Sequence, residues 1–338
     1  METTRQQSIV NDMPLQPNDL TDIIITVPPQ KNNKETLTIT IGIILSQLIS
    51  LLSVSNGMFS RQLEVNKHCV TPLIYTSTYY FLLFIVWLCI NRSINKPKLI
   101  YILLTFIDSQ ANFINVYVFT IIRFEYPYII NFSSAVWSFL LTLIIIKKYK
   151  YTNTHFIGIA ISLFGIIIAI LGTFDNLNNI HLLFNNMKGL LLCIGNSLLY
   201  ALNSVLQEKY LNENNNINNY FIWSGLIGSI ITFSESFVFN ELWTIMNNVY
   251  IDIYFILYWI AFAVSLCLIA SVSPFFIMKY SATMFNIGMA CTVFWSFILN
   301  IFIQIDANTE FNILYFVGFG FIIGGIIMFN YKKVIYSN

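Results

Sequence analysis

Ten apolar stretches, each long enough to cross a lipid bilayer as a helix, dominate this sequence of 338 residues. A bilayer core of about 30 Å is crossed by roughly 20 helical residues, and an isolated strand there would leave its backbone groups unpaired. The chain is 57% hydrophobic and 10% charged, which is more apolar surface than a soluble protein of this length buries. The stretches lie near residues 36–60, 70–90, 98–122, 126–146, 153–172, 187–207, 219–240, 253–278, 281–303 and 311–331. The sequence therefore predicts an all-α integral membrane protein with ten transmembrane helices in the lipid bilayer.

The placement of Lys and Arg predicts how these helices are oriented, because cytoplasmic connections are enriched in basic residues. With both termini cytosolic, thirteen basic residues fall on the inner side of the membrane. Four fall on the outer side: Arg61, Lys67, Arg123 and Lys188. Residues 1–35 are polar and are predicted to form a disordered cytosolic tail, and residues 332–338 form the other cytosolic tail. The net charge of +1 gives no reason to expect a nucleic-acid partner.

The two halves of the chain resemble each other in the order and spacing of several motifs. Trp137-Ser138-Phe139 matches Trp295-Ser296-Phe297 at an offset of 158 residues, and Asn56 and Arg61 match Asn203 and Glu208 at an offset of 147. Because each half holds five helices, the second half would enter the membrane in the opposite orientation. The predicted organisation is a five-helix repeat over 36–172, a connecting loop over 173–186 and an inverted five-helix repeat over 187–331. The two repeats would surround a central cavity.

An acidic side chain near the middle of the third stretch is the first candidate for function. Asp108 lies about ten residues from the start of its stretch, which places it roughly 15 Å deep by helical rise. Asn112 and Asn115 follow on the same helical face. Ionisable groups at this depth usually face a bundle interior or a wet cavity, where a carboxylate can bind a proton or a cationic solute. The alternative is a side chain that only holds helices together.

Further polar side chains project from the fourth, sixth and ninth stretches. In the sixth stretch, four polar residues recur at spacings of 4, 3 and 4 and so share one face. Matching polar residues in symmetric helices are typical of a site between two repeats, and hydrogen bonding or close packing between helices is the alternative. The predicted substrate-binding residues are Asp108, Asn112, Asn115, Asn131, Ser134, Asn196, Tyr200, Asn203, Gln207, Asn286 and Ser296.

Several classes of function lack their characteristic residues in this sequence. The histidines His68, His155 and His181 fall in loops or at the ends of stretches, so no intramembrane metal site or acid–base pair is visible. The sequence contains no Walker-type glycine loop and no potassium-channel filter motif. We therefore expect neither an enzyme nor a bound cofactor. A membrane scaffold or receptor that transports nothing is the alternative class.

Glycines in the fifth and tenth stretches are spaced for close approach of two helices. They include Gly158 and Gly165 in the fifth stretch and Gly320 and Gly324 in the tenth. Such glycines serve equally well to pack helices within one chain or to form a homodimer through these two stretches.

Four motifs, in this order along the chain, resemble those of the F-type subgroup of solute carrier family 35, within the drug/metabolite transporter superfamily. They are Asp108-Ser109-Gln110-Ala111-Asn112-Phe113, His155-Phe156-Ile157-Gly158, Tyr200-Ala201 through Gln207-Glu208, and Tyr280-Ser281-Ala282-Thr283. The resemblance covers most of residues 40–332, with Phe113 standing where the subgroup often has Tyr. It implies an inverted-repeat bundle whose central cavity alternates between the two sides of the membrane.

The same family includes nucleotide-sugar carriers, whose phosphates call for Lys or Arg in the cavity. Here the basic residues near the bundle are Arg123 and Lys279, both at the ends of stretches. A nucleotide-sugar antiporter is therefore the less favoured alternative. Together with Asp108, the resemblance implies a secondary transporter of a small neutral or cationic solute, nucleobase-like or heteroaromatic in character.

Overall fold

The computed structural model describes residues 33–67, 69–91, 95–122, 124–146, 149–150, 152–173, 187–214, 216–248, 252–303, 313–329 and 335–336. The predicted N-terminal tail up to residue 32, the connecting segment 174–186 and most of the C-terminal tail lie outside these residues. The described residues from Ile41 onward form one compact unit, and residues 33–40 belong to a separate one.

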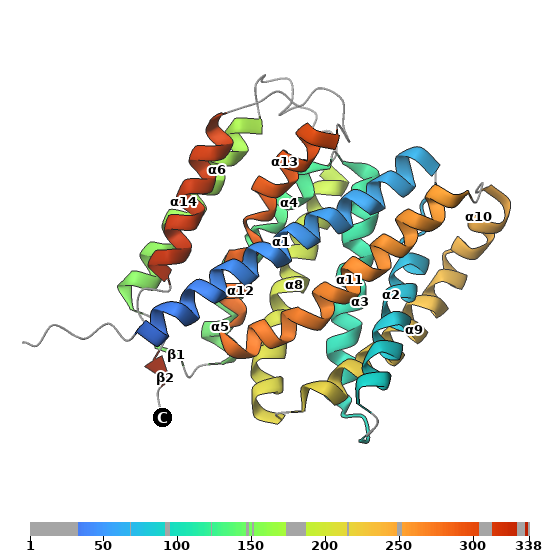
Figure 1. The fold of residues 1–338 in the computed structure, drawn as a ribbon, viewed down its shortest axis with the longest axis horizontal. Coiled ribbons are helices and arrows are strands. Elements are labelled where there is room, and N and C mark those ends of the chain that lie inside the picture. Colours follow the sequence, from blue (N-terminus) through green and yellow to red (C-terminus); the bar gives the residue numbers. More distant parts are fainter. Residues whose placement is uncertain are drawn as a thin grey trace, which may run out of the picture. The chain divides into compact units, whose positions relative to one another are not determined.

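Long helices that run back and forth build the compact unit (Figure 1). The helices of the first half are α1 (Asn33–Lys67), α2 (Pro72–Ile90), α3 (Leu99–Ile121), α4 (Glu125–Asn131), α5 (Ser133–Ile145) and α6 (Asn153–Thr173). Those of the second half are α8 (Met187–Asn214), α9 (Ile217–Val238), α10 (Glu241–Asn248), α11 (Ile253–Lys279), α12 (Ala282–Met289), α13 (Thr292–Ile303) and α14 (Ile313–Phe329). Two short strands, β1 (Tyr149–Lys150) and β2 (Ile335–Tyr336), pair in antiparallel fashion.

Eight helical segments of the described chain are long and apolar enough to cross a membrane. They are α1, α2, α3, α4 with α5, α8, α9, α11, and α12 with α13. Large apolar side chains such as Leu99, Phe302 and Val238 are exposed on the helix surfaces, as expected of surfaces that face lipid. The prediction of an all-helical, multi-pass membrane protein is thus confirmed. The shorter apolar helices α6 and α14 correspond to the fifth and tenth stretches, and their membrane crossing stays a prediction.

Two of the membrane-length segments are interrupted at corresponding positions of the two halves. Phe132 separates α4 from α5, and Ala290 and Cys291 separate α12 from α13. Phe132 and Ala290 are 158 residues apart, the same offset that separates Trp137 from Trp295. The shared interruption agrees with the sequence repeat, while the two-fold relation between the halves stays a prediction.

Helices α6 and α14 pack side by side through their glycines (Figure 1). A Cβ atom on Gly158 would lie 2.6 Å from the backbone nitrogen of Phe329 and 2.8 Å from the carbonyl oxygen of Gly325. A Cβ atom on Gly165 would lie 2.6 Å from the carbonyl oxygen of Gly318. These glycines therefore allow the two backbones to approach closely within one chain.

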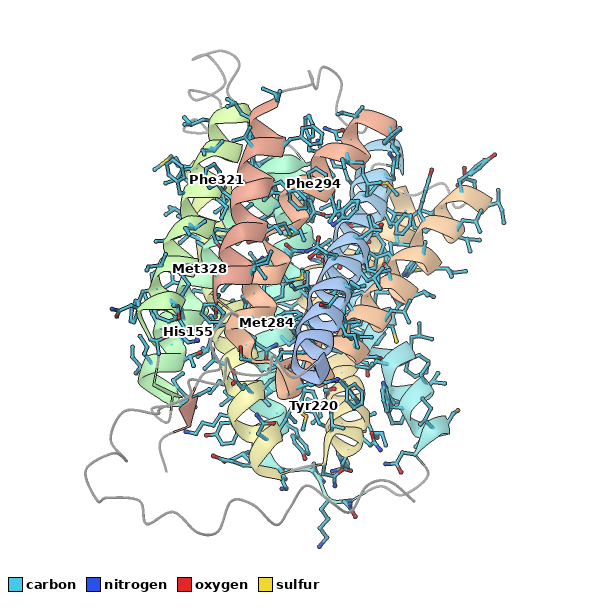
Figure 2. All side chains as sticks on the ribbon, turned by 60° about the vertical axis from the view of Figure 1, so that its left-hand side comes forward. His155, Tyr220, Met284, Phe294, Phe321 and Met328 are labelled. Carbon is cyan, nitrogen blue, oxygen red and sulfur yellow. The ribbon has the colours of Figure 1, made fainter. Side chains whose placement is uncertain are left out.

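Two further glycines of α14 take no part in this packing. A Cβ atom on Gly320 or Gly324 would meet no described atom within 4 Å. Phe321, which lies between them in the sequence, meets Phe164 of α6 with ring centroids 5.2 Å apart (Figure 2). A homodimer through α6 and α14 stays a prediction, and Gly320 and Gly324 are the glycines of α14 available for it.

We expect Gly158→Ala to lower the stability of the protein although alanine favours helix, because the added methyl group would overlap backbone atoms of α14. The loss should be about 1–3 kcal/mol. Gly320→Ala is the matched control, since it adds the same methyl group to open space. Thermal unfolding of both variants in detergent measures the effect. Equal unfolding temperatures would contradict the role given to the α6–α14 contact.

Helix α10 is attached to the start of α2 by a buried carboxylate. The Oε2 atom of Glu241 accepts hydrogen bonds from the backbone N–H groups of Leu73 and Ile74, each at 3.0 Å. These N–H groups belong to the first turn of α2, where helical N–H groups have no partner within the helix. Burial raises the pKa of Glu241 to about 7 from its ordinary value, and the two N–H donors oppose part of that shift. The contact therefore titrates near neutral pH.

The raised pKa predicts that stability falls as the pH rises from the ordinary glutamate value, near 4.5, to about 7. In this window the unfolded chain ionises at Glu241 more readily than the folded protein does. Glu241→Gln keeps an oxygen for the two N–H groups but cannot ionise. We expect the unfolding temperature of the wild type to fall more steeply with pH than that of the variant. Parallel curves for the two proteins would refute this prediction.

Candidate functional site

A cavity lies among α1, α2, α3, α4, α5, α8, α9, α11, α12 and the start of α13. It has an empty volume of about 1210 Å³, which includes the open space at its mouth. Its wall combines tyrosine and phenylalanine rings with amides, hydroxyl groups and a carboxylate. Helices α6, α10 and α14 contribute no described residue to this wall.

Nine of the eleven residues predicted from the sequence line this cavity: Asp108, Asn112, Asn115, Asn131, Ser134, Tyr200, Asn203, Gln207 and Asn286. Asn196 is buried behind the wall, where its amide nitrogen lies 3.3 Å from Oδ1 of Asn115 and 3.4 Å from Oδ1 of Asn131. Ser296 donates to the carbonyl oxygen of Val293 in its own helix. The structure thus brings nine predicted residues together and leaves two outside, and their role in binding stays a prediction.

Asp108 of α3 accepts hydrogen bonds from three helices. Its Oδ2 atom accepts from the hydroxyl groups of Tyr80 at 2.6 Å and Tyr79 at 3.3 Å, both on α2. It also accepts from Nδ2 of Asn112 at 3.2 Å, one helical turn further along α3. The Oδ1 atom accepts from Nδ2 of Asn203 on α8 at 2.8 Å. These neutral donors replace much of the hydration that a carboxylate loses on burial.

A second layer of hydrogen bonds fixes the donors around Asp108. The hydroxyl group of Tyr200 on α8 donates to Oδ1 of Asn112 at 2.9 Å. The amide nitrogen of Asn112 donates to the hydroxyl oxygen of Tyr79 at 2.8 Å. Helices α2, α3 and α8 are therefore tied together around the carboxylate. Asp108 both connects helices and lies on the cavity wall, so the two interpretations of this residue are compatible.

Sequence reasoning missed the tyrosines of α2 and α9. Tyr79 and Tyr80 are adjacent in the sequence, and Tyr220 lies near the start of α9, yet all three line the cavity. The chain contains 19 tyrosines, so an individual tyrosine carried little information. The adjacent pair in a membrane-length stretch was the available signal, because a buried tyrosine hydroxyl needs a hydrogen-bond partner.

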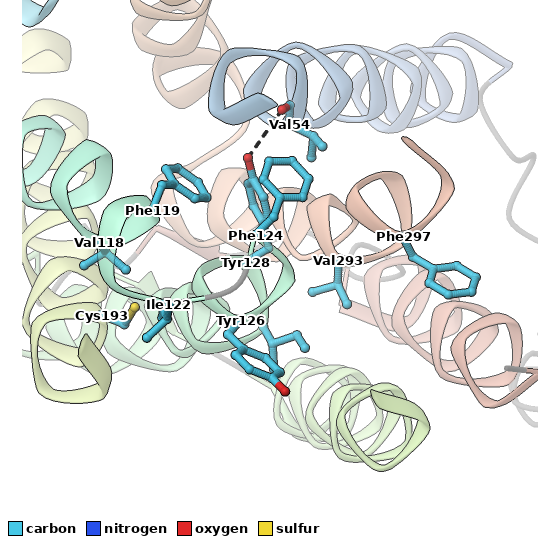
Figure 3. Close-up of a cluster of buried hydrophobic side chains, with 11 residues drawn as sticks. Val54, Val118, Phe119, Ile122, Phe124, Tyr126, Tyr128, Cys193, Val293 and Phe297 are labelled. Atoms are coloured by element: carbon cyan, nitrogen blue, oxygen red, sulfur yellow. Dashed lines mark hydrogen bonds between the residues drawn. The ribbon is translucent and has the colours of Figure 1, made fainter. Parts of the chain in front are cut away.

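An apolar cluster adjoins the cavity at the end of the bundle where α1 ends (Figure 3). Tyr128 belongs both to this cluster and to the cavity wall, and its hydroxyl group lies 3.4 Å from the carbonyl oxygen of Val54. A Cβ atom on Gly57 would overlap the Tyr128 hydroxyl group, so glycine is required for this approach of α1 to α4. Arg61, one turn further, donates to the carbonyl oxygen of Phe119. This region is termed the Arg61 end of the cavity.

Polar contacts join two helices at the opposite end, where α8 ends and α12 begins. The carboxylate of Glu208 accepts a hydrogen bond from the backbone N–H of Ala282 at 2.7 Å. The amide nitrogen of Asn286 donates to the hydroxyl oxygen of Ser204 at 2.7 Å. Ser281, just before α12, has a φ of 147°, which L-residues rarely adopt. This region is termed the Glu208 end.

The two ends use corresponding positions of the sequence repeat. Arg61 and Glu208 are 147 residues apart, the offset of the first matching motif. Tyr128 and Asn286 are 158 residues apart, the offset of the second. In the first half, α1 contacts Tyr128 near the start of α4 and Phe119 near the end of α3. In the second half, α8 contacts Ala282 and Asn286 near the start of α12. The equivalent contacts lie at opposite ends of the cavity.

Membrane-length helices around a cavity with polar and aromatic side chains in its wall define a multi-pass membrane protein of the transporter class. The F-type family model of solute carrier family 35 matches residues 34–331. The chain belongs to this family, whose members are membrane transporters and not enzymes. One solved crystal structure is similar with a TM-score of 0.62 and 13% sequence identity, covering 87% of this chain and 96% of its own. At that identity the similarity shows the fold alone.

Tyr80→Phe removes the shortest hydrogen bond to Asp108 and leaves the ring in place. We expect it to lower stability by about 1–2 kcal/mol, because a buried carboxylate loses one of its donors. Tyr254→Phe is the matched control, since the Tyr254 side chain on α11 is 62% exposed. Thermal unfolding in detergent compares the two variants with the wild type. If both variants unfold alike, the Tyr80 bond does not contribute to stability.

Proposed function

We propose that this protein is a secondary transporter that moves a small neutral or cationic solute through the central cavity by alternating access. The observation that carries the proposal is the charge of the cavity wall. Among the described lining residues, Asp108 is the one charged side chain, and Lys and Arg are absent. A carboxylate attracts a cation and repels a phosphate, and tyrosine faces attract both cations and planar rings. A nucleobase-like or heteroaromatic solute fits this chemistry.

A nucleotide sugar would meet no cationic side chain in the part of the cavity wall that the structure describes. Lys279 lies outside the wall, with its Nζ atom 5.4 Å from the ring centroid of Tyr280. Arg61 is engaged with the carbonyl oxygen of Phe119. Arg123, the other basic residue that the sequence places near the bundle, lies outside the described residues. Phosphate binding would require such a group to face the solute.

The proposal includes ten spans, with α6 and α14 as the fifth and tenth, in two inverted repeats and with both termini cytosolic. The equal offsets of the helix interruptions and of the contacts at the two cavity ends support the repeat. The pairing of β1 with β2 supports the topology, because it keeps the segment after α5 and the C-terminal segment on one side of the membrane. Both segments are rich in lysine, as cytosolic segments are.

Alternating access requires each end of the cavity to open while the other is closed. At the Arg61 end, opening would separate Gly57 from Tyr128 and break the Arg61 hydrogen bond. At the Glu208 end, it would break the hydrogen bonds of Glu208 and Asn286. Each set includes a contact between the first helix of one half and the start of the fourth segment of that half. The paired contacts are thus placed to act as two gates.

Uptake of a defined metabolite mixture into proteoliposomes, measured by mass spectrometry, tests this function. The mixture should contain neutral heteroaromatic solutes, organic cations and phosphorylated metabolites. We expect accumulation of neutral or cationic compounds over protein-free liposomes. Accumulation of phosphorylated compounds alone would favour the nucleotide-sugar alternative. Accumulation of none would favour a scaffold or receptor.

Asp108→Asn tests the role of the carboxylate, because it preserves shape and hydrogen-bonding capacity but removes the charge. We expect uptake of the accumulated solute to fall about tenfold or more, or to lose its pH dependence, at an unchanged protein level. Glu235→Gln is the matched control, since Glu235 on α9 bonds to Gln110 outside the cavity wall. A variant at Asp108 with the wild-type rate and pH profile would remove the carboxylate from the mechanism.

A further inference from the structure

Two side chains of α8 on the cavity wall carry amide oxygens that have no hydrogen-bond partner in the described chain. The oxygens are Oδ1 of Asn203 and Oε1 of Gln207, and the two side chains are only 4% and 6% exposed. The residues are four positions apart and therefore lie on one helical face. A buried carbonyl oxygen without a partner costs about 1–3 kcal/mol, so native structures nearly always supply one. The cavity thus contains two adjacent acceptors that lack donors.

The orientation of the two amides follows from what their nitrogen atoms bind. Nδ2 of Asn203 donates to Oδ1 of Asp108 at 2.8 Å. An ionised carboxylate only accepts hydrogen bonds, so beside ionised Asp108 the amide of Asn203 directs its nitrogen to the carboxylate and its oxygen elsewhere. Nε2 of Gln207 donates to the hydroxyl oxygen of Tyr220 at 3.1 Å. The carboxylate of Asp108 therefore orients the Asn203 amide, Tyr220 holds the Gln207 amide, and in this arrangement both oxygens remain for another molecule.

We propose that Asn203 and Gln207 form an acceptor pair that selects solutes with N–H or O–H groups. The inference rests on the proposed function, because it places the solute in the same cavity. A solute that presents two donors along one edge satisfies both oxygens. A solute that only accepts, such as a carboxylate or phosphate, meets oxygens without donors and is rejected. Because Asp108 adjoins Asn203, a cationic donor group such as an amidinium is preferred over a neutral amide.

Four small aromatic probes separate hydrogen-bond donation from charge. Benzamidine and phenyltrimethylammonium are both aromatic cations at neutral pH, but the second has no N–H group. Benzamide and N,N-dimethylbenzamide are the corresponding neutral pair. Binding to the purified full-length protein is measured by isothermal titration calorimetry. We expect benzamidine to bind at least about tenfold more tightly than phenyltrimethylammonium, and benzamide more tightly than its dimethyl analogue.

Gln207→Met removes one acceptor and keeps a side chain of similar length. We expect it to reduce the preference for benzamidine over phenyltrimethylammonium by about tenfold. Gln47→Met is the matched control, because Gln47 is an intramembrane amide on α1 that bonds to Cys291 outside the cavity wall. It should keep the wild-type preference. If the Gln207 variant does not fold, the comparison of the probes on the wild-type protein still tests the inference.

The outcomes distinguish this inference from the proposed function. If phenyltrimethylammonium binds the wild type as tightly as benzamidine, the acceptor pair does not select donors, although the cavity remains a cation site. If the preference exists but survives in Gln207→Met and is lost in Gln47→Met, the acceptors lie elsewhere. If no probe binds, the inference is wrong, whereas uptake of a cation by proteoliposomes would still support transport.

Discussion

The arrangement around Asp108 depends on one constraint: a carboxylate that is buried away from water needs hydrogen bonds from the protein to replace its hydration. Moving such a group from water costs several kcal/mol unless hydrogen bonds replace its hydration. Tyr79, Tyr80, Asn112 and Asn203 supply these bonds from three helices. The same bonds therefore fix α2, α3 and α8 around the cavity. They also orient Asn203 so that its oxygen remains available to a solute.

The two ends of the cavity differ in chemistry although they use corresponding positions of the sequence. The Arg61 end is built from aromatic and aliphatic side chains, and separating them exposes apolar surface. At the Glu208 end, hydrogen bonds join Glu208 to Ala282 and Asn286 to Ser204, and water can replace such bonds. The family membership and the family-like motifs around Asp108 and Glu208 connect this construction with transport.

Helical periodicity in the sequence predicted which helix faces line the cavity, but not how far along each face the cavity extends. Asp108, Asn203 and Gln207 were found because polar residues recur along apolar helices. Asn196 shares their face and lies behind the wall, since periodicity does not define where a cavity ends. The tyrosines were missed because their role depends on contacts between α2 and α3 and between α8 and α9 that no single helix contains. Likewise, no glycine or proline stands at position 132 to indicate that the helix is interrupted there.

Cysteine accessibility at Ser134 tests most directly that one cavity is reached from both sides of the membrane. Ser134 is buried, lies midway along the segment formed by α4 and α5, and lines the cavity. Ser134→Cys would be placed in a protein whose five native cysteines are replaced by serine or alanine. A membrane-impermeant thiol reagent is then added to either side of oriented vesicles. The account predicts labelling from both sides and protection by transported solute, and labelling from one side under all conditions would contradict it.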